Sequence, residues 1–252
     1  MKPTLFVLRY ATEGELERLM NFYRANAKVA SPPPSIGSLN KALQTGRLMV
    51  IEPEDGGGYV AASATFDFSP DGFTAHVGEL SGTCVTRPLG GCRPLNVQRM
   101  FIAARVAVHA VFSSEPEEGG TDTLISIVKR DNEASLRNIE AAGLVPAPAL
   151  PDWMDYEHHS WTGDGGDGWA YYLATASTVR QAVADLDTLG FFSGRVRLTR
   201  DDLVNGGEEA IEIRCALRGM EMAEADLREI AAGRQHVHLG APLARLVRRS
   251  VK

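Results

Sequence analysis

The feature that most constrains the fold is a long helix with one broad apolar face, predicted over residues 97–112. Its apolar residues recur at helical spacing and are Val97, Met100, Phe101, Ala104, Val108 and Val111. Such a face packs better on a sheet than in water, so we expect the helix to be half-buried. The segments on either side of it, 76–86 and 124–129, have the composition of strands. The sequence therefore predicts helices packed on a sheet.

The N-terminal part supplies further strands and a helix. Residues 5–10 (LFVLRY) form a short apolar run of strand type, and Thr12 and Glu15 follow it as a T-x-x-E capping box. A helix that packs on the sheet is therefore predicted from about Glu13. The runs 47–52 and 59–68 flank the turn PEDGGG and predict a hairpin.

Glycines mark the irregular points of the next elements. Gly78 and Gly82 interrupt the predicted strand 76–86, which indicates a bulge or a close approach of another backbone. A later helix is predicted from Asn132 to Ala142, because Asn is a preferred N-cap and Gly143 fits the position just past the helix end.

Composition limits the class of protein. With 252 residues, 44% of them hydrophobic and 23% charged, the chain resembles an ordinary soluble protein. No apolar run approaches the roughly 18 residues of a membrane helix, and the N-terminus turns acidic too early for a secretory signal. We therefore expect a cytoplasmic protein with no membrane partner. The formal charge of −6 argues against a nucleic-acid partner and favours cationic or neutral small substrates.

Neither a disulfide framework nor a metal site is predicted. The cysteines form no C-x-x-C pair and are expected to be buried thiols; they are Cys84, Cys92 and Cys215. His158 and His159 are adjacent, so in a strand they point to opposite faces. His236 and His238 lack a third ligand at the usual spacing.

The C-terminal residues are predicted to form a small α/β appendage. We place the boundary after residue 176, with a main domain over 1–176 and the appendage over 177–252. The appendage is expected to contain strands and helices in alternation: a helix opened by a capping box at Thr178 and Gln181, strands at 195–199 and 210–217, and a helix over 223–232.

The order of elements from residue 5 to about 176 resembles the GCN5-related N-acetyltransferase (GNAT) family. The signature of that family, Q/R-x-x-G-x-G/A, is met by R-P-L-G-G-C through Arg87, Gly90 and Cys92, with Gly91 between them and Cys departing from Gly/Ala. The resemblance implies a mixed, mostly antiparallel central sheet flanked by helices. It also implies that this turn binds the phosphates of acyl-CoA at a helix N-terminus. The alternative is a simple turn between strand and helix.

A second motif extends the resemblance. The family pattern N-x-x-A/S-x-x-L-Y-x-x-x-G-F is matched in register by Asn132, Ser135, Asn138, Ile139 and Gly143. The resemblance implies that Asn132 and Ser135 approach the pantetheine and phosphates, although Asn132 is also explained as an N-cap. Ile139 stands where many members have a tyrosine that protonates the leaving thiolate, and isoleucine cannot transfer a proton.

The remaining site residues also come from the resemblance. The cofactor is expected beside the strand segment 79–86, where backbone amides of Cys84 and Val85 would contact it. Glu79 is the leading candidate for the general base that takes a proton from the acceptor amine, and His76 is a weaker one. The alternative for Glu79 is a strand carboxylate that faces solvent or pairs with an arginine.

The favoured function is therefore an acyl-CoA-dependent N-acyltransferase, with acetyl-CoA as the expected donor and a small-molecule or peptide amine as acceptor. Trp153, Asp155 and Tyr156 are candidate residues for binding a cationic amine. A second hypothesis is a non-catalytic acyl-CoA-binding or assembly module, motivated by Cys92 and Ile139, whose appendage forms a homodimer or contacts a partner. A dinucleotide site is a third, weaker hypothesis, because only two adjacent glycines support it.

Overall fold

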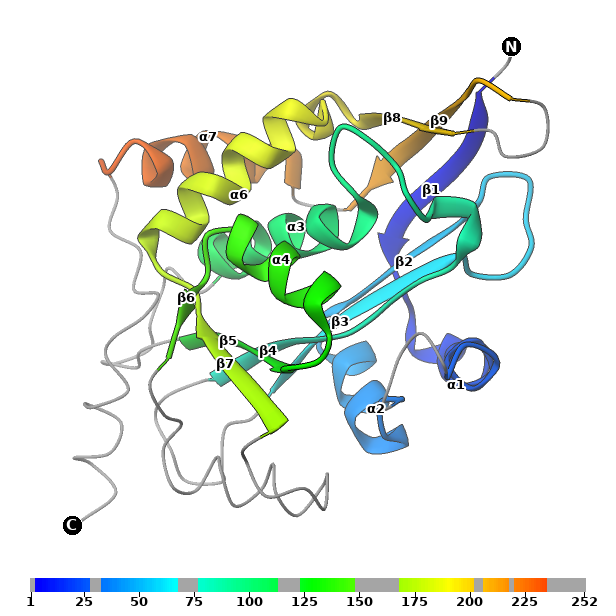
Figure 1. Cartoon of the computed structure of the whole chain (residues 1–252), viewed down its shortest axis with the longest axis horizontal. Coiled ribbons are helices and arrows are strands. Elements are labelled where there is room, and N and C mark those ends of the chain that lie inside the picture. The colour runs from blue at the N-terminus through cyan, green and yellow to red at the C-terminus, as the bar shows by residue number, and fades with distance from the viewer. Residues whose placement is uncertain are drawn as a thin grey trace.

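The described part of the chain folds into one mixed sheet with helices on both faces (Figure 1). The computed structural model describes residues 3–27, 33–67, 77–112, 123–147, 168–201, 206–217 and 220–234. The strands are β1 (Thr4–Tyr10), β2 (Leu48–Pro53), β3 (Ala61–Asp67), β4 (Val77–Val85), β5 (Thr123–Lys129), β6 (Val145–Pro146), β7 (Trp169–Leu173), β8 (Arg195–Asp201) and β9 (Glu208–Ala216). The α-helices are α1 (Leu16–Ala25), α2 (Ile36–Gln44), α3 (Val97–Phe112), α4 (Glu133–Ala141), α6 (Ala176–Thr188) and α7 (Met220–Ala231). Short 3-10 helices are η1 (Glu13–Glu15), η2 (Arg87–Leu89) and η5 (Phe191–Ser193).

The strand order confirms the predicted fold class. Across the sheet the described strands run β6-β7-β5-β4-β3-β2-β1-β9-β8. Neighbours are antiparallel except for two parallel pairs, β4 with β5 and β1 with β9. The sheet is therefore mixed and mostly antiparallel.

Each face of the sheet has its own hydrophobic core. Side chains alternate along a strand, so in β2 Met49 and Ile51 join the core under α3, α6 and α7, whereas Leu48 and Val50 join the core under α1 and α2. Figure 1 shows these two helical layers on opposite sides of the sheet. Within the residues described here, no helix combines the length and the apolar character that crossing a bilayer requires.

The bulge predicted from the glycines of 76–86 lies in β4. The pairing of β4 with β3 shifts register between Ala62 and Ala64, and Gly82 beside it adopts the left-handed conformation, with φ of +59°. The Tyr23 hydroxyl of α1 donates a hydrogen bond to the Gly82 carbonyl. The bulge is therefore held from the α1 side of the sheet.

The C-terminal segment joins the same sheet and core. β9 pairs in parallel with β1, and β8 pairs with β9, so both strands extend the sheet beyond β1. α6 packs on α3, and Arg99 of α3 forms a bidentate ion pair with Asp185 of α6 at 2.6 and 2.7 Å. The predicted appendage thus shares the sheet and the core of the preceding residues.

The cap of α6 differs from the predicted one. The helix begins at Ala176, and its N-cap is Thr175, whose backbone N–H donates to the Thr178 hydroxyl at 2.9 Å. Thr178 is therefore the third residue of the helix rather than its cap. The reason is that two threonines three residues apart form the box one turn earlier than the Thr-Gln pair.

Gly143 ends α4 as predicted, and its replacement tests the close packing there. Its φ is +79°, and an added Cβ would lie 3.3 Å from the Gln181 Cβ of α6. We expect Gly143→Ala to lower the free energy of unfolding by about 2 kcal/mol in urea denaturation, combining left-handed strain with crowding. Gly91→Ala is the matched control, because φ is +72° but no atom lies within 4 Å; about 1 kcal/mol is expected. Equal losses would show that the contact with α6 is unimportant.

Candidate functional site

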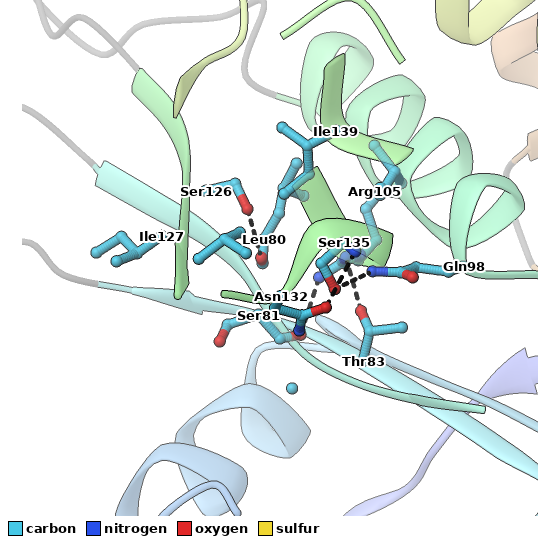
Figure 2. Close-up of a pocket in the computed structure, with 13 residues that line it drawn as sticks. Leu80, Ser81, Thr83, Gln98, Arg105, Ser126, Ile127, Asn132, Ser135 and Ile139 are labelled. Atoms are coloured by element: carbon cyan, nitrogen blue, oxygen red, sulfur yellow. Dashed lines mark hydrogen bonds between the residues drawn. The ribbon is translucent and has the colours of Figure 1, made fainter. Parts of the chain in front are cut away.

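A cleft opens where β4 and β5 separate. The two parallel strands are paired only from Val77 to Glu79 and from Thr123 to Ile125. Beyond that point residues 80–83 of β4 and 126–128 of β5 line opposite walls of a cavity of about 100 Å³. Figure 2 shows these walls with α3 and α4 beside them. Because the strands part, peptide groups of β4 at the cleft are not used in pairing with β5.

A polar network closes the α3 and α4 side of the cleft. The Gln98 amide donates to the Ser135 hydroxyl at 3.0 Å and accepts from the Asn138 amide at 2.7 Å. Asn96 donates to Asn138 at 2.6 Å. The side-chain amide oxygen of Asn132 accepts from the Ser135 backbone N–H at 3.1 Å, so Asn132 is the N-cap of α4 as predicted. The N-terminal ends of both helices are therefore joined by side-chain amides.

The two predicted motifs are placed differently. Asn132 and Ser135 line the cleft. The turn that contains Arg87, Gly90 and Gly91 does not open a helix, since α3 begins at Val97, so the predicted position of this turn at a helix N-terminus is wrong. The carbonyl groups of Arg87 and Pro88 instead accept hydrogen bonds from the Arg200 guanidinium of β8. The role of the turn in cofactor binding stays a prediction.

The residues at the start of α3 belong to a second segment that begins with the same tripeptide, RPL. RPLGGC (87–92) is followed directly by RPLNVQ (93–98). Asn96 and Gln98 occupy the places of Gly90 and Cys92, and the Asn96 side chain accepts from the Arg99 N–H at 2.9 Å, as an N-cap does. RPL occurs at 87–89 and again at 93–95, and this repeat could have indicated two candidate turns, RPLGGC and RPLNVQ.

Three other predicted cofactor contacts lie away from the cavity. Cys84 is fully buried in the core under α1 and α2, and Cys92 is buried in the core on the other face. Burial raises the pKa of each thiol to about 11, so both are protonated thiols at neutral pH. Val85 continues β4 past the cleft and is paired with Ala61 of β3. Thr83 is the last residue of β4 that lines the cleft.

Glu79 is the last residue of β4 that is paired with β5, and it directly precedes the β4 residues that line the cleft. Its carboxyl group is buried, and burial raises its pKa to about 7, against the opposing effects of a hydrogen bond with Ser81 and of the nearby Arg105 charge. A carboxylate with this pKa is half protonated near neutral pH. A pKa near the working pH is what a general base requires.

Arg105 is a cleft residue that the sequence analysis did not identify. It lies on α3 and is 3% exposed. Its guanidinium donates to the carbonyl groups of Ala64 and Ser81, the latter at 3.1 Å, and to the Thr83 hydroxyl at 3.2 Å. The signal was present, because Arg105 interrupts the apolar sequence FIAARVAV of the helix.

The other predicted site residues fall into two groups. Ile139 is buried and lines the cleft, so an apolar side chain occupies the wall where the resemblance implies a tyrosine. The candidate amine-binding residues Trp153, Asp155 and Tyr156, and the weaker base candidate His76, lie outside the described residues.

Comparison with known proteins finds likeness at the level of the fold. No family model matches the chain, and no curated protein matches it. A GNAT-family acetyltransferase from Listeria monocytogenes is 12% identical, with a TM-score of 0.45 over 67% of this chain and 94% of that one. A ribosomal-protein-alanine N-acetyltransferase from Brucella melitensis is 20% identical, with a TM-score of 0.43 over 66% and 96% of the two chains. An Arabidopsis thaliana acetyltransferase, NAA60 in complex with acetyl-CoA, is 11% identical, with a TM-score of 0.42 over 67% and 96%.

Proposed function

We propose that the protein is an acyl-CoA-dependent N-acyltransferase that uses acetyl-CoA and an amine acceptor. The observation that carries this proposal is the parting of β4 and β5 beside a buried carboxyl group, Glu79. The gap offers peptide groups to an extended ligand, and the carboxyl group offers a base beside the reacting end. An acyl transfer to an amine needs both.

Pantetheine suits the walls of the cleft. It is an extended chain with two amide groups, and an extended chain with amides binds to an open strand edge as an added strand would. Residues 80–83 of β4 line the cleft without pairing with β5, and the carbonyl groups of Leu80 and Ser81 accept from the side chains of Ser126 and Arg105. The cavity of about 100 Å³ is smaller than the ~300–1,000 Å³ of sites that enclose a drug-sized ligand, so it fits the thioester with a short acyl group.

The phosphate end of the cofactor is assigned to the neighbouring starts of α3 and α4. Helix N-termini present backbone N–H groups and the positive end of the helix dipole, which favour phosphate. Asn96, Gln98 and Ser135 place polar side chains at the same point, where Gln98 donates to Ser135 and Asn96 donates to Asn138. In this proposal the segment RPLNVQ, rather than RPLGGC, provides the phosphate-binding turn.

Binding of acetyl-CoA tests the assignment. We expect Ser135→Glu to weaken it at least about tenfold in isothermal titration, because a carboxylate at the α4 start repels the phosphates. Gly90→Glu is the matched control: Gly90 is exposed, has an ordinary φ of −70° and lies outside the cleft, so binding should stay within about twofold. Loss of binding in Gly90→Glu alone would return the phosphate site to RPLGGC. Absence of binding to the native chain would contradict the proposed function.

The buried Ile139 favours one alternative, an acyl-CoA-binding module without catalysis, because no tyrosine is present there to protonate a thiolate. The two functions differ in turnover. A native chain that binds acetyl-CoA and releases CoA thiol with a primary amine or a peptide N-terminus is an enzyme. Tight binding with no thiol release across a panel of amines would identify the module.

A further inference from the structure

We propose that Arg105 is a catalytic residue that stabilises the leaving CoA thiolate electrostatically, in place of a proton-donating side chain. This inference rests on the proposed function and deepens it. Arg105 and Ile139 line the same cleft (Figure 2), one with a positive charge and the other without any ionisable group. Among the described residues that line this cleft, Arg105 alone carries a full charge.

Burial of the Arg105 charge is unfavourable in free energy unless an anion interacts with it. The side chain is 3% exposed, and its described hydrogen-bond acceptors are neutral: the carbonyl groups of Phe101, Ala64 and Ser81 and the hydroxyl of Thr83. Burial of a guanidinium without a hydrogen-bonded carboxylate is unfavourable. Burial lowers the pKa of Arg105, and the nearby Tyr23 and Glu79 oppose that effect. An anion that forms in the cleft would therefore be attracted strongly.

A purely structural role is the competing explanation. The guanidinium bridges β3 and β4 at the bulge, because it reaches Ala64 on one strand and Ser81 and Thr83 on the other. That role predicts a loss of stability on replacement but no effect on the ionisation of a thiol. The two roles are therefore separated by a measurement on the bound thiol.

The charge balance of the step is simple. The amine nitrogen forms a bond to the thioester carbon, the carbon–sulfur bond breaks, and its electron pair leaves on sulfur as a thiolate. The proton of the amine goes to the Glu79 carboxylate and then to solvent, and the thiolate takes a proton from water. Arg105 keeps its proton throughout and only lowers the energy of the negative sulfur.

The test compares the affinities of CoA and acetyl-CoA at pH 6.5 and 8.5. A cysteine thiol titrates at about 8.5 in water; for a CoA thiol of that pKa, a decrease of one unit caused by Arg105 makes CoA gain about fivefold over acetyl-CoA between these pH values. The ratio of the CoA affinity to the acetyl-CoA affinity does not depend on titration of the phosphates, because both ligands carry the same phosphates. The groups around Arg105, namely Glu79 from β4, Tyr23 from α1 and His109 one turn along α3, are present in the native protein and in the Arg105 variants alike, so the variants control for them.

Arg105→Met keeps the length of the stem and removes the charge, and Arg105→Lys keeps a charge. We expect the native ratio to rise about fivefold, to stay flat in Arg105→Met and to rise partly in Arg105→Lys. A flat ratio in the native protein, or an equal rise in Arg105→Met, would overturn the inference while leaving cofactor binding intact. A flat native ratio overturns the inference even if Arg105→Met does not fold, and a native rise is then assigned to Arg105 by its partial loss in Arg105→Lys. If neither ligand binds the native protein, the proposed function itself fails.

Discussion

Replacement of Glu79 by Gln is expected to lower kcat for acyl transfer at least about 100-fold, with the affinity for acetyl-CoA unchanged. The buried carboxyl group beside the cleft is the proposed acceptor of the amine proton, and an amide of the same shape cannot take it. Steady-state thiol release and isothermal titration measure the two quantities. Glu229→Gln on the exposed part of α7 is the control and should keep full activity.

The pH profile gives this prediction a second readout. Burial raises the pKa of Glu79 to about 7, so its base form makes up half of the molecules near pH 7 and roughly a tenth near pH 6. kcat/KM should therefore rise with pH across this range and level off above it, and the rise should disappear in Glu79→Gln. A variant that keeps the native rate and profile would show that another group, or water, takes the proton.

Removal of the Asp185 carboxylate is expected to lower the free energy of unfolding by about 3 kcal/mol, or roughly 6 to 12 °C in Tm. Its side chain is 5% exposed and forms the bidentate pair with Arg99, and Gln181 donates a third hydrogen bond at 2.8 Å. Asp185→Ala leaves the Arg99 guanidinium, 19% exposed, without this partner. Thermal and urea unfolding measure the loss.

Asp187→Ala is the matched control for Asp185→Ala. Asp187 lies two residues further along α6 and pairs with Arg228 at 2.7 Å, but its side chain is 42% exposed. Exposed ion pairs contribute at most about 1 kcal/mol, so a small loss is expected. If the two variants lost the same stability, the buried pair between α3 and α6 would not hold the helices together.

The sequence predicted elements with strong local signals. Apolar spacing placed α3, and the Asn132 to Gly143 pattern placed α4, because helix periodicity and caps depend on residues near one another in the chain. The glycines of β4 likewise indicated the bulge. Pairing between distant segments was not predictable in this way: nothing local in RVRLT or AIEIRCAL shows that β9 lies beside β1.

The site was predicted in part for the same reason. Asn132 and Ser135 follow from a motif on one helix, and they line the cleft. The turn RPLGGC, for which the resemblance implies phosphate binding, lies several residues before the start of α3, and its role in cofactor binding stays a prediction. Arg105 was missed because its hydrogen bonds depend on the β4 bulge, where carbonyl groups of β3 and β4 lie close to this residue of α3.

The parallel pairing of β9 with β1 has a consequence for synthesis of the chain. Thr4 pairs with Ile211 and Arg9 with Ala216, so β1 lies in the interior of the sheet between β2 and β9, a strand that is synthesised much later than β1. While the ribosome is still adding the segments between them, β1 has one open edge, and open edges pair readily with wrong partners. Unfinished chains are therefore the form of this protein most exposed to aggregation, and closure of that edge waits for the emergence of β9.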